Sequence, residues 1–136
     1  MIDLNLERRA VACTHWRWMP GMLAIAYDDQ AWRCVDHRAR EDVDDVGQVW
    51  ANASGSCDMV FGSLLTQRLT PDLTEPATVG CLLALVRAAW GDPYLTVDIC
   101  GVEDHRVWAC YSCDLIAHAY GDTEAAALVA ALEAAP

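Results

Sequence analysis

The chain has no lysine, a single phenylalanine and no long apolar run. All nine basic side chains are arginines, and they stand against twenty acids, which gives a formal net charge of -11. A protein this acidic is poorly suited to neutralising nucleic-acid phosphates, so we expect no DNA or RNA partner. A bilayer span needs about twenty consecutive apolar residues. The sequence contains no such stretch, so we expect no membrane partner either.

Motifs that carry common catalytic chemistry are also missing. The sequence has no His-Glu-x-x-His, no Gly-x-Ser-x-Gly and no glycine-rich phosphate loop. The four histidines are scattered along the chain at His15, His37, His105 and His118. We therefore predict no catalytic residues and no cofactor, and we favour a protein that is not an enzyme.

The N-terminal stretch 1–9 places acids before its arginines and has no apolar core of the kind found in secretion signals. We therefore expect a cytoplasmic protein. Its seven cysteines, an odd number, then indicate small buried hydrophobic side chains rather than a disulfide framework.

A zinc site is the alternative use of the cysteines. Cys34-x-x-His37 and Cys110-x-x-Cys113 would together supply four ligands, the number that structural zinc requires. Residues 110 and 113 of an extended strand point to opposite faces, however. We therefore predict no metal site, with these four residues as the alternative.

The spacing of apolar and turn residues predicts helices and strands along the first half of the chain. Asn5 is expected to cap a first helix. The stretches 22–27 and 31–36 follow at hairpin distance, and 46–52 is a candidate third strand. The charged stretch 38–45 is typical of a solvated loop.

The second half begins with the clearest helix signal. Thr74 is a candidate cap, Pro76 opens the helix, and Gly91 follows Trp90 where a C-terminal glycine belongs. The interior Gly80 costs about 1 kcal/mol relative to alanine, which suggests close packing there.

A second hairpin is expected from 94–100 and 106–112, and a last alanine-rich helix begins near Thr123. Together these elements predict an α+β fold. It would consist of an antiparallel sheet of about four to five strands, built from the two hairpins and packed with about three helices. At 136 residues, we expect a single domain over 1–136.

The segment Trp16-Arg17-Trp18 is the strongest candidate for recognition, because both side-chain types stack on planar groups. In one interpretation, alternation sends both tryptophans into the core and leaves Arg17 in water. In the other, a tryptophan lines a pocket and arginines hold phosphate or carboxylate. Residues 1–40 favour such a pocket, because they carry six arginines against five acids.

Several blocks of the sequence carry a resemblance to a known group of proteins. The residues involved are 9–13, 16–22, 71–78, 80–93, 123–125 and 127–136. They resemble small uncharacterised proteins of tailed phages and prophages, and the arrangement of elements is similar to the phage α/β/α sandwich domain. The stretch 28–70 has no counterpart in this resemblance. The resemblance implies a phage context and brings no catalytic residues.

These observations lead to a binding protein as the first hypothesis. It would be a phage protein of the host bacterial cytoplasm that sequesters a nucleotide-derived immune signal, as a homodimer or higher homo-oligomer. Its candidate ligand residues are Arg8, Arg9, His15, Trp16, Arg17, Trp18, Trp32 and Arg33. The alternatives are an acidic inhibitor that docks on a host protein, and a zinc-binding or metal-dependent protein.

Overall fold

The computed structural model describes residues 3–26, 29–39, 46–52, 57–61, 69–101, 104 and 106–136. The chain divides into two compact units, one of residues 3–17 and 79–136 and the other of residues 18–78. Helices and antiparallel sheets are both present, which confirms the expected α+β class. Within the described ranges, no helix is long and apolar enough to cross a bilayer. The expectation of a single domain stays a prediction.

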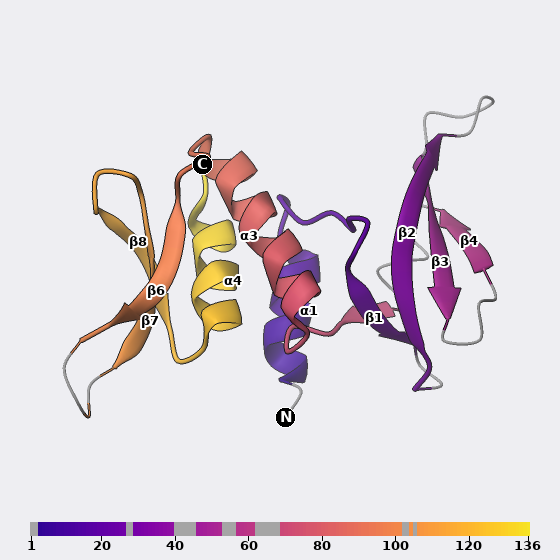
Figure 1. Ribbon diagram of the computed structural model, residues 1–136, viewed down its shortest axis with the longest axis horizontal. Coiled ribbons are helices and arrows are strands. Elements are labelled where there is room, and N and C mark those ends of the chain that lie inside the picture. Colours follow the sequence, from indigo (N-terminus) through magenta and orange to yellow (C-terminus); the bar gives the residue numbers. More distant parts are fainter. Residues whose placement is uncertain are drawn as a thin grey trace. The chain divides into compact units, whose positions relative to one another are not determined.

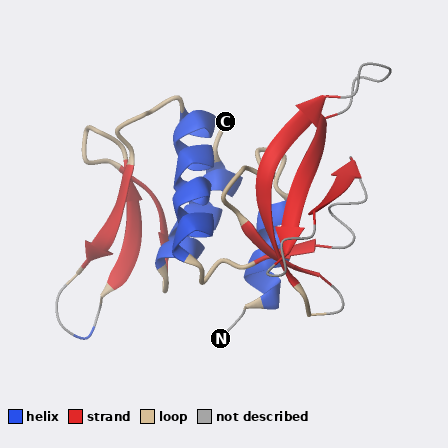
Figure 2. Cartoon of the chain, turned by 45° about the vertical axis from the view of Figure 1, so that its right-hand side comes forward, coloured by secondary structure: helices blue, strands red, loops and turns tan. Residues whose placement is uncertain are grey.

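The first unit combines three helices with a three-stranded antiparallel sheet (Figure 1). The helices are α1 (Leu4–Ala12), α3 (Pro76–Trp90, in this unit from Val79 on) and α4 (Glu124–Ala134). The strands are β6 (Thr96–Cys100), β7 (Val107–Tyr111) and β8 (Ala117–Gly121), paired in that order. Helix α4 packs on the sheet and also contacts α1. The view of Figure 2 shows this sheet beside the helices.

Hydrogen bonds at the helix ends correct two sequence predictions. Asp3, not Asn5, caps α1, because its carboxylate accepts from the backbone N–H groups of Asn5 and Leu6. Glu75, not Thr74, satisfies the start of α3 by accepting from the backbone N–H of Thr78 at 2.8 Å. A carboxylate at this end also interacts favourably with the helix dipole. The last helix begins next to Thr123 as predicted, and the Thr123 side chain caps it by accepting from the backbone N–H of Ala126.

The end of α3 agrees with its predicted glycine stop. Gly91 has a φ of +63°, and its N–H donates to the carbonyl of Ala88. The N–H of Asp92 donates to the carbonyl of Arg87 at 3.0 Å. These two bonds form a Schellman motif, which satisfies carbonyls that a helix end otherwise leaves open.

The prediction of close packing at Gly80 is wrong. A Cβ atom at this position would meet no heavy atom within 4 Å. The close approach occurs instead at Gly121 of β8, where a Cβ would lie 2.3 Å from the backbone nitrogen of Ala127 in α4. Gly121, where β8 ends before α4, therefore has no room for a larger residue. Gly80 in α3 has that room, and its only effect on stability is the low helix propensity of glycine.

The second unit is built on a five-stranded antiparallel sheet in the order β4-β3-β2-β1-β5 (Figure 1). Its strands are β1 (Leu23–Ala26), β2 (Ala31–Ala39), β3 (Val46–Asn52), β4 (Cys57–Phe61) and β5 (Leu69–Pro71). The predicted pairing of β1 with β2 and the third strand at 46–52 are confirmed. Strand β2 continues through Arg38 and Ala39, which we had assigned to a loop, because β3 pairs along its full length. The remainder of that predicted loop, 40–45, lies outside the described residues.

The two predicted hairpins do not join into one sheet. The β1–β2 hairpin belongs to the five-stranded sheet, and the β6–β7 hairpin belongs to the three-stranded one. Each hairpin also pairs with a strand that was not assigned from the sequence, β5 beside β1 and β8 beside β7. Local alternation identifies a strand, but it does not say which strand it pairs with.

The core of the second unit centres on two tryptophans. Trp18 and Trp50 are 3% and 1% exposed, and their rings meet edge to face with centroids 5.1 Å apart. This geometry is favourable for aromatic pairs because the ring edge is positive and the ring face negative. Met22 and Cys34 are buried in the same unit.

Candidate functional site

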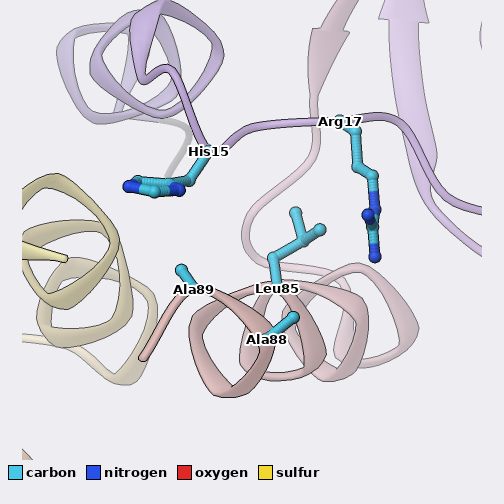
Figure 3. A pocket seen from close by; sticks show the side chains of 5 residues that line it. All are labelled: His15, Arg17, Leu85, Ala88 and Ala89. Carbon is cyan, nitrogen blue, oxygen red and sulfur yellow. The ribbon is translucent and has the colours of Figure 1, made fainter. Parts of the chain in front are cut away.

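A small pocket in the first unit lies between the segment after α1 and one face of α3. It is lined by His15, Arg17, Leu85, Ala88 and Ala89, and its volume is about 170 Å³. Figure 3 shows His15 and Arg17 on one chain segment, with the Arg17 side chain extending toward α3, the His15 ring above Ala89, and Leu85 between them. One wall is therefore polar and cationic, and the other is apolar and made of small side chains.

The end of α1 fixes the polar wall. Cys13 leaves the helix with extended backbone angles, and its thiol donates to the carbonyl of Leu132 in α4 at 3.5 Å. The backbone N–H of Trp16 then donates to the carbonyl of Cys13 at 3.0 Å, which closes a turn around His15. This turn is held to α4, so it presents His15 and Arg17 on a fixed support.

The predicted arginines differ in what already holds them. Arg9 makes a bidentate ion pair with Glu133, with contacts of 3.0 and 2.6 Å, and Arg33 donates to Glu75 and to the carbonyl of Gly21. Arg17 makes no hydrogen bond or ion pair with any residue in the described part of the chain. Its guanidinium is thus available to a ligand, whereas Arg9 and Arg33 would have to exchange a partner.

The pKa shifts agree with these pairings. The Glu133 hydrogen bond raises the pKa of Arg9, and the same bond lowers the pKa of Glu133. Burial acts to raise the pKa of Glu75, but hydrogen bonds from Thr78 and Arg33 outweigh it and leave that pKa lowered. Both carboxylates are therefore charged at neutral pH and engage their arginines.

The eight predicted ligand residues are divided between the two units. Five of them belong to the first unit and the other three to the second. The first group is Arg8, Arg9, His15, Trp16 and Arg17, and the second is Trp18, Trp32 and Arg33. Only two of the eight, His15 and Arg17, line the pocket. Arg8 is exposed on α1, on the outside of the same unit.

The tryptophans of the Trp16-Arg17-Trp18 segment largely follow the first of our two interpretations. Trp18 is only 3% exposed, so it has almost no surface on which a ligand could stack. Trp16 and Trp32 are half-buried, and Arg17 is exposed. Arg17 nevertheless lines a pocket rather than pointing into open solvent, because His15 and the α3 face lie beside it.

The alternative zinc ligands are also distributed over both units. Cys34 lies on β2 of the second unit, together with the backbone of His37, whose side chain lies outside the described part. Cys110 and Cys113 belong to the first unit. Burial raises the pKa of Cys110 to about 11, so in the metal-free chain its thiol is protonated at neutral pH. Among the described residues, no group of three His, Cys, Asp or Glu side chains could hold a metal ion.

The apolar wall was missed at the sequence level. Leu85, Ala88 and Ala89 stand at helical spacings of three and four, so periodicity alone places them on one face of α3. Alanine carries no chemical signal of its own, however, and nothing in the sequence shows which segment faces it.

No protein family, curated protein or solved structure matches this chain.

Proposed function

We propose that this chain is a non-catalytic binding protein that holds the anionic part of a small nucleotide-like ligand between Arg17 and His15. The observation that carries the proposal is the Arg17 guanidinium, which lines a pocket and makes no ion pair with any described residue. Guanidinium groups bind phosphate oxygens through two parallel hydrogen bonds, which gives both strength and orientation.

The size of the pocket limits what it can hold. A volume of about 170 Å³ is smaller than the roughly 300–1,000 Å³ of pockets that enclose drug-sized molecules. It is close to the roughly 150 Å³ cavity that holds a single benzene ring. The pocket would therefore take one phosphate or one ring of a ligand, and the rest would extend over the surface.

The chemistry of the wall supports binding rather than turnover. Opposite Arg17 and His15 stand only a leucine and two alanines, so the described pocket pairs no nucleophile with a base. The finer part of the proposal rests on the phage resemblance. In this finer proposal, the protein is a homo-oligomer in the host cytoplasm that binds and sequesters a nucleotide-derived immune signal without converting it.

Native mass spectrometry tests this proposal most directly. The purified chain would be exposed to AMP, to inorganic phosphate and to nucleotide extracts of cells with activated defence, and the retained mass measured. Arg17→Gln should weaken retention by about 10- to 100-fold, because a charge-assisted hydrogen bond contributes about 1.5–3 kcal/mol.

The matched control is Arg8→Gln, which removes the same charge from an exposed position of the same unit. Its affinity should stay within about twofold of the unaltered chain. Equal retention by the Arg17 and Arg8 variants, or no retained nucleotide or phosphate at all, would refute the proposal.

A further inference from the structure

The imidazole of His15 is as accessible to a ligand as the guanidinium of Arg17. The ring is half-buried and lines the pocket above Ala89 (Figure 3). It makes no hydrogen bond or ion pair with any residue that the structure describes. The other described histidine side chain of this unit differs, because His118 stacks on Trp90 with ring centroids 4.0 Å apart. Both ring nitrogens of His15 are therefore available to an anion in the pocket.

The two polar side chains of the pocket differ in how their charge depends on pH. A guanidinium stays charged at every pH that a folded protein meets, whereas imidazole changes its charge between about pH 5 and pH 8. The remaining lining residues are Leu85, Ala88 and Ala89, so no carboxylate lines the described pocket. An anionic ligand would thus be the negative group that His15 faces there.

The nearest charged side chains on the packed helices already have partners. Arg9, in the last turn of α1, pairs with Glu133, in the last turn of α4. Arg87 of α3 donates its Nε–H to the carbonyl of Leu95 at 2.8 Å. The other ionisable side chains on these three helices, none of which lines the pocket, are Glu7, Arg8, Cys81 and Glu124. Arg17 is therefore the charged group that shares the pocket with His15.

This arrangement makes the charge of His15 sensitive to a bound anion. Two cations in one small pocket repel each other, so Arg17 opposes a proton on His15 while the pocket holds no anion. A bound anion attracts both charges and removes that opposition. The imidazolium also offers an N–H donor from each ring nitrogen, whereas neutral imidazole offers one donor and one lone pair.

We propose that anion binding at the Arg17 pocket is coupled to protonation of His15. The chain takes up one proton from solvent as it binds, and it holds its ligand more tightly as the pH falls from about 8 toward about 5. This inference rests on the function proposed above, and it adds the protonation state in which the site works.

The experiment measures sulfate binding by the full chain across this range of pH, using NMR of the histidine ring protons. Sulfate keeps both of its negative charges throughout, whereas a phosphate monoester itself titrates near about pH 6. Any dependence of sulfate affinity on pH therefore comes from the protein. The series is repeated with AMP, so that the state of His15 is also followed with a larger anion.

The affinity of the unaltered chain for sulfate should fall about fivefold to tenfold between about pH 5.5 and pH 7.5. This follows because a hydrogen bond from a charged donor is roughly twice as strong as one from a neutral donor. The bound anion should move the midpoint of the His15 titration to higher pH and leave that of His118 unchanged. His15→Gln should bind sulfate with an affinity that no longer varies with pH, whereas the control His118→Gln should keep the dependence.

The possible failures separate the coupling from the proposed function. A bound anion that leaves the His15 midpoint in place, or an affinity that does not vary with pH, overturns the coupling and leaves the proposed binding function standing. A pH dependence that persists in His15→Gln overturns it as well. Absence of binding of both sulfate and AMP at every pH refutes the proposed function, and the coupling with it. The midpoint is measured on the unaltered chain, so this test does not depend on the folding of a variant.

Discussion

Replacing Gly80 by alanine should stabilise the protein, because the residue lies in the interior of helix α3. Glycine costs about 1 kcal/mol relative to alanine at such a position, because it loses more backbone freedom on folding. The structure shows nothing to offset this gain, since a Cβ at Gly80 meets no heavy atom within 4 Å and the residue is exposed. The full propensity difference of about 1 kcal/mol should therefore appear as added stability.

Urea unfolding followed by tryptophan fluorescence measures this directly. The midpoint should rise while the slope with urea stays unchanged, which signals a change in stability alone. The matched comparison is Gly121→Ala, whose Cβ would lie 2.3 Å from the nitrogen of Ala127 and should cost about 1–3 kcal/mol. Opposite signs for the two variants are expected. Destabilisation by Gly80→Ala would show that the face of α3 around Gly80 is covered, and the reasoning would fail.

Two further predictions concern titrating groups. Cys110 should resist alkylation at pH 7 while exposed Cys113 reacts, which mass mapping of the labelled thiols checks. Because the pKa of Cys110 is raised to about 11, its thiol ionises first in the unfolded chain, and the free energy of unfolding should decline as pH rises from about 9 toward about 11. Unfolding measured at several pH values checks this. Glu75→Gln should cost about 1–2 kcal/mol at pH 7, because it weakens the bonds to Arg33 and Thr78. Because the pKa of Glu75 is lowered in the folded chain, this cost should diminish as pH falls below about 4.5, and a cost that does not diminish below that pH would contradict the assignment.

The elements that sequence reasoning predicted well are those with strong local signals. The helix that ends at Gly91 and the hairpin between β6 and β7 need only periodicity and a turn residue, and both are present. Strand β8 was missed, because Ala117–Gly121 is short and lacks the alternation of large apolar residues that marks a strand. Its place in the sheet depends on pairing with β7 and packing under α4, which are contacts between distant parts of the chain.

The candidate site was predictable only on its charged side. Arg17 stood out because it lies between two tryptophans in the less acidic first forty residues, and His15 because it lies next to that segment. Which arginines are already paired depends on long-range contacts, such as that of Arg9 with Glu133, 124 residues away. Sequence alone therefore indicated eight candidates and could not separate the two that line a pocket from the others.

Asp92 shows how unequal mutational tolerance can be along one short loop. Its backbone N–H helps to end α3, and its two carboxylate oxygens each receive a backbone N–H from a different loop. Asparagine preserves only one of the two oxygen acceptors, and glutamate moves both by a methylene. In a library of all single substitutions, those at position 92 should lower stability by about 1–3 kcal/mol, whereas those at its exposed neighbours Pro93 and Tyr94 should change stability little. Such a profile would identify, residue by residue, the position of this loop on which the fold depends.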